Sequence, residues 1–384
     1  MPDASPRRPS AIRMLVFMFL PAIVFLGLVE TVVRFTGVAE TCLPTMHAAD
    51  SFWACDPLLY FKNNPDLKVM GKPLNAAGFR GREFLPKKPG VFRVIALGDS
   101  STFGLAESDE GFYVREPYPR LLEHMLGQVY GPARVEVLNA GSIGYNSYQG
   151  LLLLRTKLRW LKPDLVTVRF GWNDHLMSSS GRDEGAFRDA TNPIVRSLGN
   201  ALLRTALYPF AIRMRLESQA WLGRDEAQKP PQRSAWAPNM SIPDYQNALR
   251  QIATLGHAMG ARVWLLTAPQ GFSSEGDLER FSALPEDAKA RKLLTLNAMD
   301  SFSQMRNVHN DYIEATRDAA REAKVPLIDL DALYRNTSDP RLFALSDAVH
   351  PTLQGHILEA KALHRRLKKH RVLEDYFANA PVDP

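Results

Sequence analysis

The stretch RVIALGDSSTFG, residues 93–104, is an apolar run that ends in the triplet Gly98-Asp99-Ser100. A short apolar run with β-branched residues that is closed by a glycine predicts a strand buried on both faces. Ser100 would then follow the carboxyl end of this strand, at the edge of an α/β sheet where ligands bind. A serine in this place is, taken alone, more often a turn or N-cap residue. Its role therefore depends on what the rest of the chain places beside it.

From residue 93 onward, apolar runs of strand length alternate with amphipathic segments of helix length. The strand candidates are 93–97, 134–141, 163–171, 261–269 and 325–330. The helix candidates are 118–130, 147–161, 244–260 and 310–324. Strands that are apolar along most of their length and are separated by helices are typical of a parallel sheet. The sequence therefore predicts an α/β fold in which helices cover both faces of a central parallel sheet.

The composition is that of a globular protein. The 384 residues are enough for one large domain or two ordinary ones, and the hydrophobic fraction of 45% allows a sizeable core. The formal net charge is +6, but the basic residues are scattered. Their densest run, at 364–371, favours a solvated helix face. Because no basic stripe with interleaved aromatic residues is present, we expect no nucleic-acid partner.

Residues 14–29 form a run of sixteen residues without a charge, preceded by Arg13 and followed by Glu30 and Arg34. A spanning helix needs about 20 apolar residues, and the flanking residues extend this run to that length. The basic N-terminal flank predicts a cytoplasmic N-terminus. We therefore expect a single-pass transmembrane helix in the inner (cell) membrane, with the following domain on the periplasmic or extracellular side. A cleaved signal peptide, with a poor cleavage region at 37–39, and a buried core helix are the alternatives.

The chain divides into four parts by composition. We expect a cytoplasmic N-terminus and signal-anchor at 1–36 and an irregular, proline-containing lead-in at 37–92. The main domain follows at 93–370, with an insertion at about 175–243, and a C-terminal tail occupies 371–384.

The insertion contains an amphipathic basic segment at 192–223 and a proline-rich segment at 228–239. A helical hairpin docked on the core is the leading interpretation. A lid over the site and a helix lying on the membrane surface are the alternatives.

Two cysteines, Cys42 and Cys55, follow the N-terminal apolar run. They do not have the usual spacing of metal ligands, so we expect no metal site. In an exported domain they would form a disulfide closing a short loop, and otherwise they are ordinary thiols.

Polar residues follow the strand candidates in four blocks. They are Gly98-Asp99-Ser100, NAGSIGYN (139–146) with Gly141, GWND (171–174) with Asn173, and LSDAVHPTLQGH (345–356) with Asp347 and His350. Because the carboxyl ends of parallel strands meet at one edge of a sheet, one cleft would collect these blocks.

The residue types in these blocks meet the needs of ester hydrolysis. A serine hydroxyl is a weak nucleophile that needs a neighbouring base, which His350 can supply for Ser100. Asp347 can orient the imidazole and stabilise the imidazolium. The oxyanion of a tetrahedral intermediate needs fixed donors, and the backbone N–H groups of Ser100 and Gly141 and the side-chain amide of Asn173 are the candidates.

Other polar residues near these blocks have simpler interpretations. Asp99 would bond backbone N–H groups of its turn, and Asp174 is a weaker candidate for a supporting hydrogen bond in the site. The remaining histidines that we considered lack a comparable setting, and they are His175, His257, His309 and His356.

The four blocks stand in the order found in SGNH (GDSL-type) hydrolases, which the chain resembles over about residues 75–365 apart from the insertion. The segment NAAGFRGREF (75–84) is similar to the lead-in of a membrane-associated or secreted bacterial branch. The resemblance implies a flavodoxin-like three-layer α/β/α fold and acyl-ester hydrolysis without metal or organic cofactor. It assigns Ser100 as nucleophile, His350 as base, Asp347 as its orienting residue, and Gly141 and Asn173 as oxyanion donors. Ser101 replaces the frequent leucine, so the lipase label gains no support.

The leading hypothesis is an exported, membrane-anchored serine esterase that hydrolyses an acyl ester, with O-acetyl groups on a carbohydrate as one candidate substrate. An O-acyltransferase acting on a cell-surface glycan through the same acyl-enzyme is the first alternative. An inactive carbohydrate-binding relative is the second.

Overall fold

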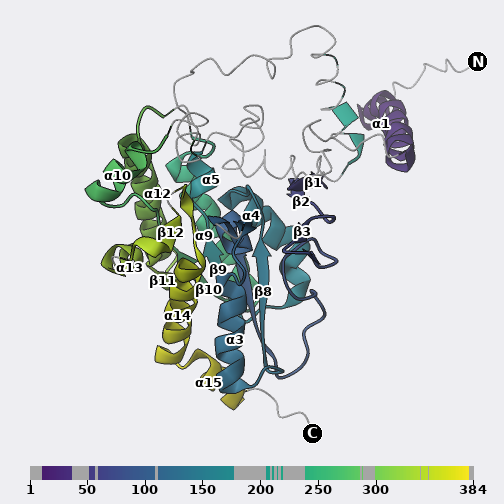
Figure 1. Cartoon of the computed structure of the whole chain (residues 1–384). Coiled ribbons are helices and arrows are strands. Elements are labelled where there is room, and N and C mark those ends of the chain that lie inside the picture. The colour runs from purple at the N-terminus through teal and green to yellow at the C-terminus, as the bar shows by residue number, and fades with distance from the viewer. Residues whose placement is uncertain are drawn as a thin grey trace, which may run out of the picture.

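The computed structural model describes residues 11–36, 52–56, 59–108, 111–176, 205–207, 210, 211, 214, 218, 238–285, 288, 299–337, 339–344 and 346–379. A five-stranded parallel sheet lies at its centre (Figure 1). In spatial order its strands are β11 (Leu327–Ile328), β10 (Arg262–Leu266), β9 (Leu165–Arg169), β5 (Phe92–Gly98) and β8 (Val135–Gly141). All five are the predicted strands, and β11 is the shortest.

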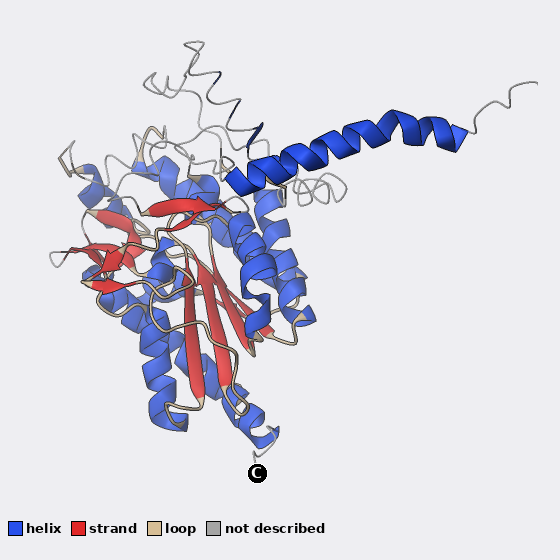
Figure 2. Cartoon of the chain, turned by 90° about the vertical axis from the view of Figure 1, so that its right-hand side faces the viewer, coloured by secondary structure: helices blue, strands red, loops and turns tan. Residues whose placement is uncertain are grey.

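Helices cover both faces of the sheet, as Figure 2 shows, so the predicted three-layer α/β/α architecture is confirmed. One layer contains α3 (Tyr118–Tyr130), α14 (Leu353–Lys369) and α15 (Val372–Asn379). The other contains α4 (Ser147–Leu153), α9 (Ile242–Ala258) and α12 (Phe302–Glu322). Successive side chains of β5 point to opposite layers: Val94 and Ala96 belong to the first core, and Ile95 and Leu97 to the second.

Two helices begin where their sequences carry capping residues. The Ser241 hydroxyl accepts the Asp244 N–H at the start of α9, and the Ser301 hydroxyl accepts the Gln304 N–H at the start of α12. The helix predicted over 147–161 follows the expected course but changes pitch. After α4 it continues as a π-helical turn, η2 (Leu154–Leu158), and a 3₁₀ turn, η3 (Arg159–Leu161), which keep Leu154, Leu158 and Leu161 buried.

The lead-in, predicted to be irregular, contains two short antiparallel strand pairs. They are β1 (Trp53–Asp56) with β2 (Tyr60–Asn63) and β3 (Lys68–Val69) with β4 (Lys72–Pro73). Leu59, Phe79 and Phe84 are buried in the same core as α4 and α9. These strands of two to four residues are too short to show a hydrophobic period in the sequence.

The carboxyl edge of the sheet carries the remaining short elements. They are α2 (Ser100–Phe103), β6 (Leu105–Ser108), β7 (Gly111–Tyr113), α5 (Trp172–His175), α10 (Glu275–Ser282), α13 (Leu330–Thr337), η6 (Pro340–Leu342), β12 (Phe343–Ala344) and β13 (Asp347–Pro351).

Near the C-terminus, residues 372–379 form the helix α15 where a tail was predicted. Val372 and Leu373 are buried there, and the Tyr376 ring meets the Phe92 ring edge-on at 5.1 Å.

The predicted apolar helix is α1 (Ala11–Thr36), which extends away from the three layers in Figure 2. Its window Phe19–Thr36 has a mean hydropathy of 1.8 and is long and apolar enough to cross a membrane.

Most of the insertion lies outside the described residues, so the helical hairpin predicted there stays a prediction. Cys42 and the Cys55 side chain also lie outside them, so the disulfide stays a prediction as well.

Candidate active site

The strand register brings the predicted polar blocks together at one edge of the sheet. Gly98 at the end of β5 lies level with Gly141 at the end of β8 and with Arg169 at the end of β9. The segments that follow these three strands therefore begin side by side. They carry Ser100, the loop 142–146 and the helix α5 that contains Asn173.

Ser100 is the first residue of α2, and two glycines allow this short helix to approach the sheet. A Cβ on Gly141 would lie 2.2 Å from the Phe103 nitrogen, and one on Gly98 would lie 2.1 Å from the Thr102 hydroxyl oxygen. Only glycine leaves room for contacts this close. The Asp99 carboxylate caps α2 by accepting the Ser101 N–H at 2.9 Å, as predicted for this residue.

Ser100, His350 and Asp347 form one hydrogen-bonded chain. The Ser100 Oγ lies 2.8 Å from His350 Nε2, and His350 Nδ1 lies 2.7 Å from Asp347 Oδ2. Both residues of the second pair belong to β13. The other oxygen of Asp347 accepts the backbone N–H groups of Val349 and His350, each at 3.0 Å, which fixes the carboxylate beside the ring.

The electrostatics of this hydrogen-bonded triad favour a charged Asp347 carboxylate and a basic His350 imidazole. Burial opposes ionisation of Asp347, but the nearby His350 ring and two backbone N–H donors hold the pKa of Asp347 below its ordinary value. Burial likewise disfavours protonated His350, but the Asp347 carboxylate raises the pKa of His350 above its ordinary value. Because an ionised carboxylate only accepts, His350 Nδ1 carries the proton, and Nε2 of the neutral ring can accept from Ser100.

The predicted oxyanion donors differ in how far they are already used. No described residue accepts from the Ser100 N–H, and the Asn173 amide donates one hydrogen to the Tyr145 carbonyl at 3.0 Å. The Gly141 N–H, however, donates to Asn139 Oδ1 at 2.9 Å. Gly144, three residues further on, has φ +84° and an N–H for which the described residues offer no acceptor. The only sequence signal for Gly144 as a donor was that the NAGSIGYN block contains a second glycine.

The lead-in holds the loop that contains Gly144. Asn63 Nδ2 donates to the Gly141 carbonyl at 3.1 Å, and Asn63 Oδ1 accepts the Ile143 N–H at 3.0 Å. The Trp53 indole N–H donates to the Ile143 carbonyl at 2.8 Å. These residues far upstream of the polar blocks carried no recognisable motif, so the sequence did not reveal them.

Helix α5 is fixed by a buried pair of histidines that the sequence did not single out. The Trp172 ring stacks on His309 with 3.8 Å between centroids, and His175 Nε2 lies 2.8 Å from His309 Nδ1. His309 Nε2 lies 2.8 Å from the Ala268 carbonyl and therefore donates to it. Burial lowers the pKa of His309 to about 3, so this pair stays neutral and serves packing.

Asp174 makes the supporting hydrogen bonds that its position suggested. Its Oδ1 accepts the backbone N–H of Ser147 at 2.9 Å and the Ser147 hydroxyl at 2.6 Å, which joins α5 to the start of α4. Burial raises the pKa of Asp174 to about 7.

The other two histidines considered in the sequence, His356 and His257, lie outside the hydrogen-bonded triad. His356 lies on α14 and accepts the Tyr118 N–H at 3.1 Å, and His257 is exposed on α9.

A buried ion pair links β9 to the helix that follows β13. Arg169 Nη1 lies 2.9 Å from Glu359 Oε1, and both side chains are 0% exposed. The Tyr334 hydroxyl donates to the same carboxylate at 2.8 Å. Through α14, this pair anchors the segment that carries His350.

Within the described ranges no cluster of histidine, cysteine and carboxylate side chains could hold a metal ion.

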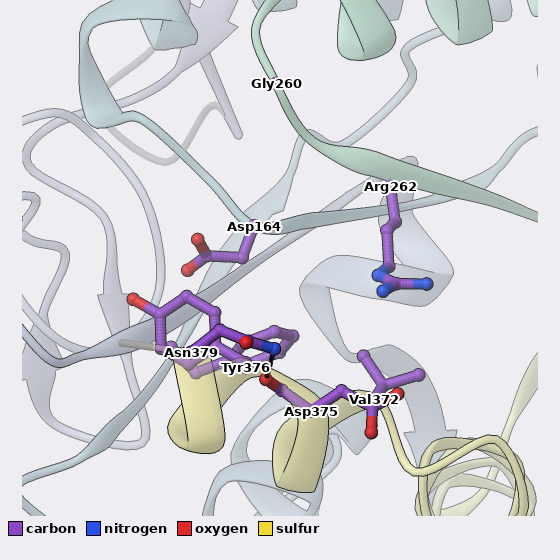
Figure 3. Close-up of a pocket in the computed structure, with 8 residues that line it drawn as sticks. Asp164, Gly260, Arg262, Val372, Asp375, Tyr376 and Asn379 are labelled. Carbon is purple, nitrogen blue, oxygen red and sulfur yellow. Dashed lines mark hydrogen bonds between the residues drawn. The ribbon is translucent and has the colours of Figure 1, made fainter. Parts of the chain in front are cut away.

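A pocket of about 360 Å³ lies at the opposite edge of the sheet, between Asp164, Arg262 and Tyr376 (Figure 3). Asp164 and Arg262 stand at the amino ends of β9 and β10, away from Ser100. The Asp164 carboxylate already accepts from Lys87 Nζ at 2.6 Å and from the Arg93 N–H at 2.7 Å. This pocket therefore has no part in the chemistry at the carboxyl edge.

The charge on Asp347 predicts how His350 titrates. We expect its ring to titrate above the ordinary histidine pKa of about 6.5, and Asp347→Asn to shift the midpoint below 6.5, because burial then acts without the compensating charge. NMR of histidine-labelled protein, with the resonance assigned through His350→Gln, measures both midpoints. His309 is the internal control, since it stays neutral over this range. An unchanged midpoint in Asp347→Asn would contradict the assignment of the shift to Asp347.

Comparison with known proteins identifies the family of the chain. Residues 96–358 match the model of the GDSL-like Lipase/Acylhydrolase family. Among solved structures, the chain is similar to a lipase/acylhydrolase from Enterococcus faecalis, with 18% identity, 73% of this chain and 97% of that chain covered, and a TM-score of 0.43. It is also similar to Axe2, an acetylxylan esterase from Geobacillus stearothermophilus, with 17% identity, 73% and 96% covered, and a TM-score of 0.42. No curated protein matches the chain. The family match spans more than half of the chain, which therefore belongs to the GDSL-like lipase/acylhydrolase (SGNH) family of carboxylic ester hydrolases.

Proposed function

We propose that the protein is an exported, membrane-anchored serine esterase that forms its acyl-enzyme on Ser100. The hydrogen-bonded chain from Ser100 through His350 to Asp347 is the observation that carries this proposal. In the first step the Ser100 Oγ attacks the ester carbonyl carbon while His350 Nε2 takes the hydroxyl proton. Asp347 stabilises the imidazolium that forms. His350 then protonates the leaving alcohol oxygen, and the acyl group remains on Ser100.

Hydrolysis of the acyl-enzyme repeats these steps with water. His350 Nε2 takes a proton from the attacking water and returns it to the Ser100 Oγ as the carboxylic acid leaves. His350 must be neutral at the start of each half-reaction. Its raised pKa therefore places the acid limb of the pH–rate profile above the ordinary histidine value.

The oxyanion donors in this proposal are the N–H groups of Ser100 and Gly144 and the amide of Asn173. Gly144 replaces Gly141 because the Gly141 N–H already donates to Asn139. Asn173 Nδ2 carries two hydrogens, and its bond to the Tyr145 carbonyl uses one of them. The other remains for the oxyanion, where one such donor contributes about 10²–10³ in rate.

We propose a small acyl group as the leaving acid, with acetyl esters of carbohydrates as the substrate class to test first. The confined setting of Ser100, a residue that is only 7% exposed, supports a small acyl group. Release of free acetate from an acetylated oligosaccharide supports the esterase. Transfer of acetyl to an added acceptor glycan in excess of free acetate would assign the same site to an acyltransferase.

The first test compares Ser100→Ala with Ser101→Ala in the full-length protein, using p-nitrophenyl acetate and a fluorophosphonate probe. Ser101 is the matched control because it is adjacent, buried and without a described partner for its hydroxyl. We expect Ser100→Ala to lose at least about 10³-fold in turnover and to lose the label found by mass spectrometry. Ser101→Ala should retain both. A label on another residue, or turnover that survives Ser100→Ala, would refute the proposal and favour a binding role.

Membrane anchoring through α1 needs its own test. Helix α1 has the length and hydropathy of a span, and its basic flank predicts a cytoplasmic N-terminus. An epitope tag placed before residue 1 should remain on the mature protein and sediment with membranes, resisting extraction by high salt. Loss of the tag from the mature protein would instead identify a cleaved signal peptide.

A further inference from the structure

We propose that Arg80, in the lead-in upstream of the family match, is a positioning residue that holds the nucleophile helix α2 in place. This inference rests on the proposed role of Ser100 and adds a residue from outside residues 96–358 to the machinery. Arg80 belongs to the segment NAAGFRGREF, whose role the polar blocks leave unexplained.

The segment 75–84 is a rigid turn that presents Arg80 to the site. Asn75 Oδ1 accepts the N–H groups of Ala77 and Phe79 at 3.0 and 2.9 Å, and Asn75 Nδ2 donates to the Arg82 carbonyl at 2.8 Å. The rings of Phe79 and Phe84 stack in the core with centroids 5.0 Å apart. The backbone that carries Arg80 is therefore fixed on both sides.

Among the described residues, the hydrogen-bond acceptors of the Arg80 guanidinium are all backbone carbonyls. Nη1 donates to Phe103 and Gly104 at 3.3 and 3.1 Å, and Nη2 donates to Arg115 at 3.0 Å and also to Val114. No described carboxylate forms an ion pair with it. Burial lowers the pKa of Arg80 to about 10, so the group stays positively charged at neutral pH.

Two of these carbonyls, those of Phe103 and Gly104, lie at the end of the helix that begins with Ser100, and the other two follow β7. Phe103 is the last residue of α2, and Gly104 is its C-cap with φ +93°. A helix of four residues leaves its final carbonyls without intrahelical partners, and a cation at that end is favourable. Asp99 thus caps one end of α2 and Arg80 the other. Because Ser100 begins α2, release of the far end would let the Ser100 Oγ shift relative to His350 Nε2, now 2.8 Å away.

Arg82 provides a matched control from the same turn. Its guanidinium pairs with carboxylates instead, 2.6 Å from Glu123 and 3.5 Å from Glu136, and donates no hydrogen bond to α2. Loss of either arginine removes one charge and several polar contacts. Of the two, only Arg80 donates hydrogen bonds to the end of the nucleophile helix.

The test measures kcat, KM, the rate of fluorophosphonate labelling and the unfolding temperature for Arg80→Ala, Arg80→Lys and Arg82→Ala in the full-length protein. We expect Arg80→Ala to lower kcat and the labelling rate by about 10–100-fold with KM within about twofold, because displacement of a reacting group by about 1 Å costs this much. Arg80→Lys should be intermediate, since an ammonium cannot serve both pairs of carbonyls. Arg82→Ala should keep kcat within about twofold whatever its effect on unfolding.

Added guanidinium ion gives a readout that a purely structural role would not move. At millimolar concentrations, far below those that unfold proteins, it should restore part of the labelling rate of Arg80→Ala but not change Arg82→Ala. If Arg80→Ala does not fold, the kcat of Arg80→Lys decides the matter. Wild-type kcat in the folded Arg80 variant, or equal losses in Arg80→Ala and Arg82→Ala, would overturn the inference. Failure of the wild-type protein to label at Ser100 would instead refute the proposed function.

Discussion

The close packing of α2 against the glycines that end β5 and β8 is the constraint on which the site depends. Gly98 and Gly141 lie level in the parallel register, and neither position has room for a Cβ beside α2. Backbone meets backbone there, which places Ser100 directly over the carboxyl edge of the sheet. The amino end of α2 is capped by Asp99 and its carboxyl end by Arg80. A helix of four residues is too short to be stable alone, so these caps and the packing against the glycines fix its position.

The partner of Ser100 comes from a segment 250 residues away, and its position is fixed independently. Backbone N–H groups of β13 hold the Asp347 carboxylate, which in turn holds the His350 ring. The buried Arg169–Glu359 pair ties α14 to β9 behind this strand. Breaking one member of such a pair would leave a buried charge without compensation, which costs about 3–5 kcal/mol. The pair therefore fixes the geometry strongly, whatever its net contribution to stability.

The sheet and the four polar blocks could be predicted because each depends on local pattern. Apolar runs of strand length recur in order, and Ser100, Asn173, Asp347 and His350 stand close after strands or in a recognisable block. Gly141 and Gly144 stand in one sequence block, and only the contact with Asn139 shows that the Gly141 N–H is already used. The contacts of Asn63 and the His175–His309 pair join segments about 80 and 134 positions apart, a distance at which sequence periodicity carries no signal.

The most direct test of this account is the structure of the protein after reaction with a small fluorophosphonate. The account predicts phosphorus bonded to the Ser100 Oγ and its free oxygen about 2.7–3.1 Å from the N–H groups of Ser100 and Gly144 and from Asn173 Nδ2. His350 should remain hydrogen-bonded to Asp347. An adduct on any other side chain, or a phosphonyl oxygen turned away from all three donors, would contradict it.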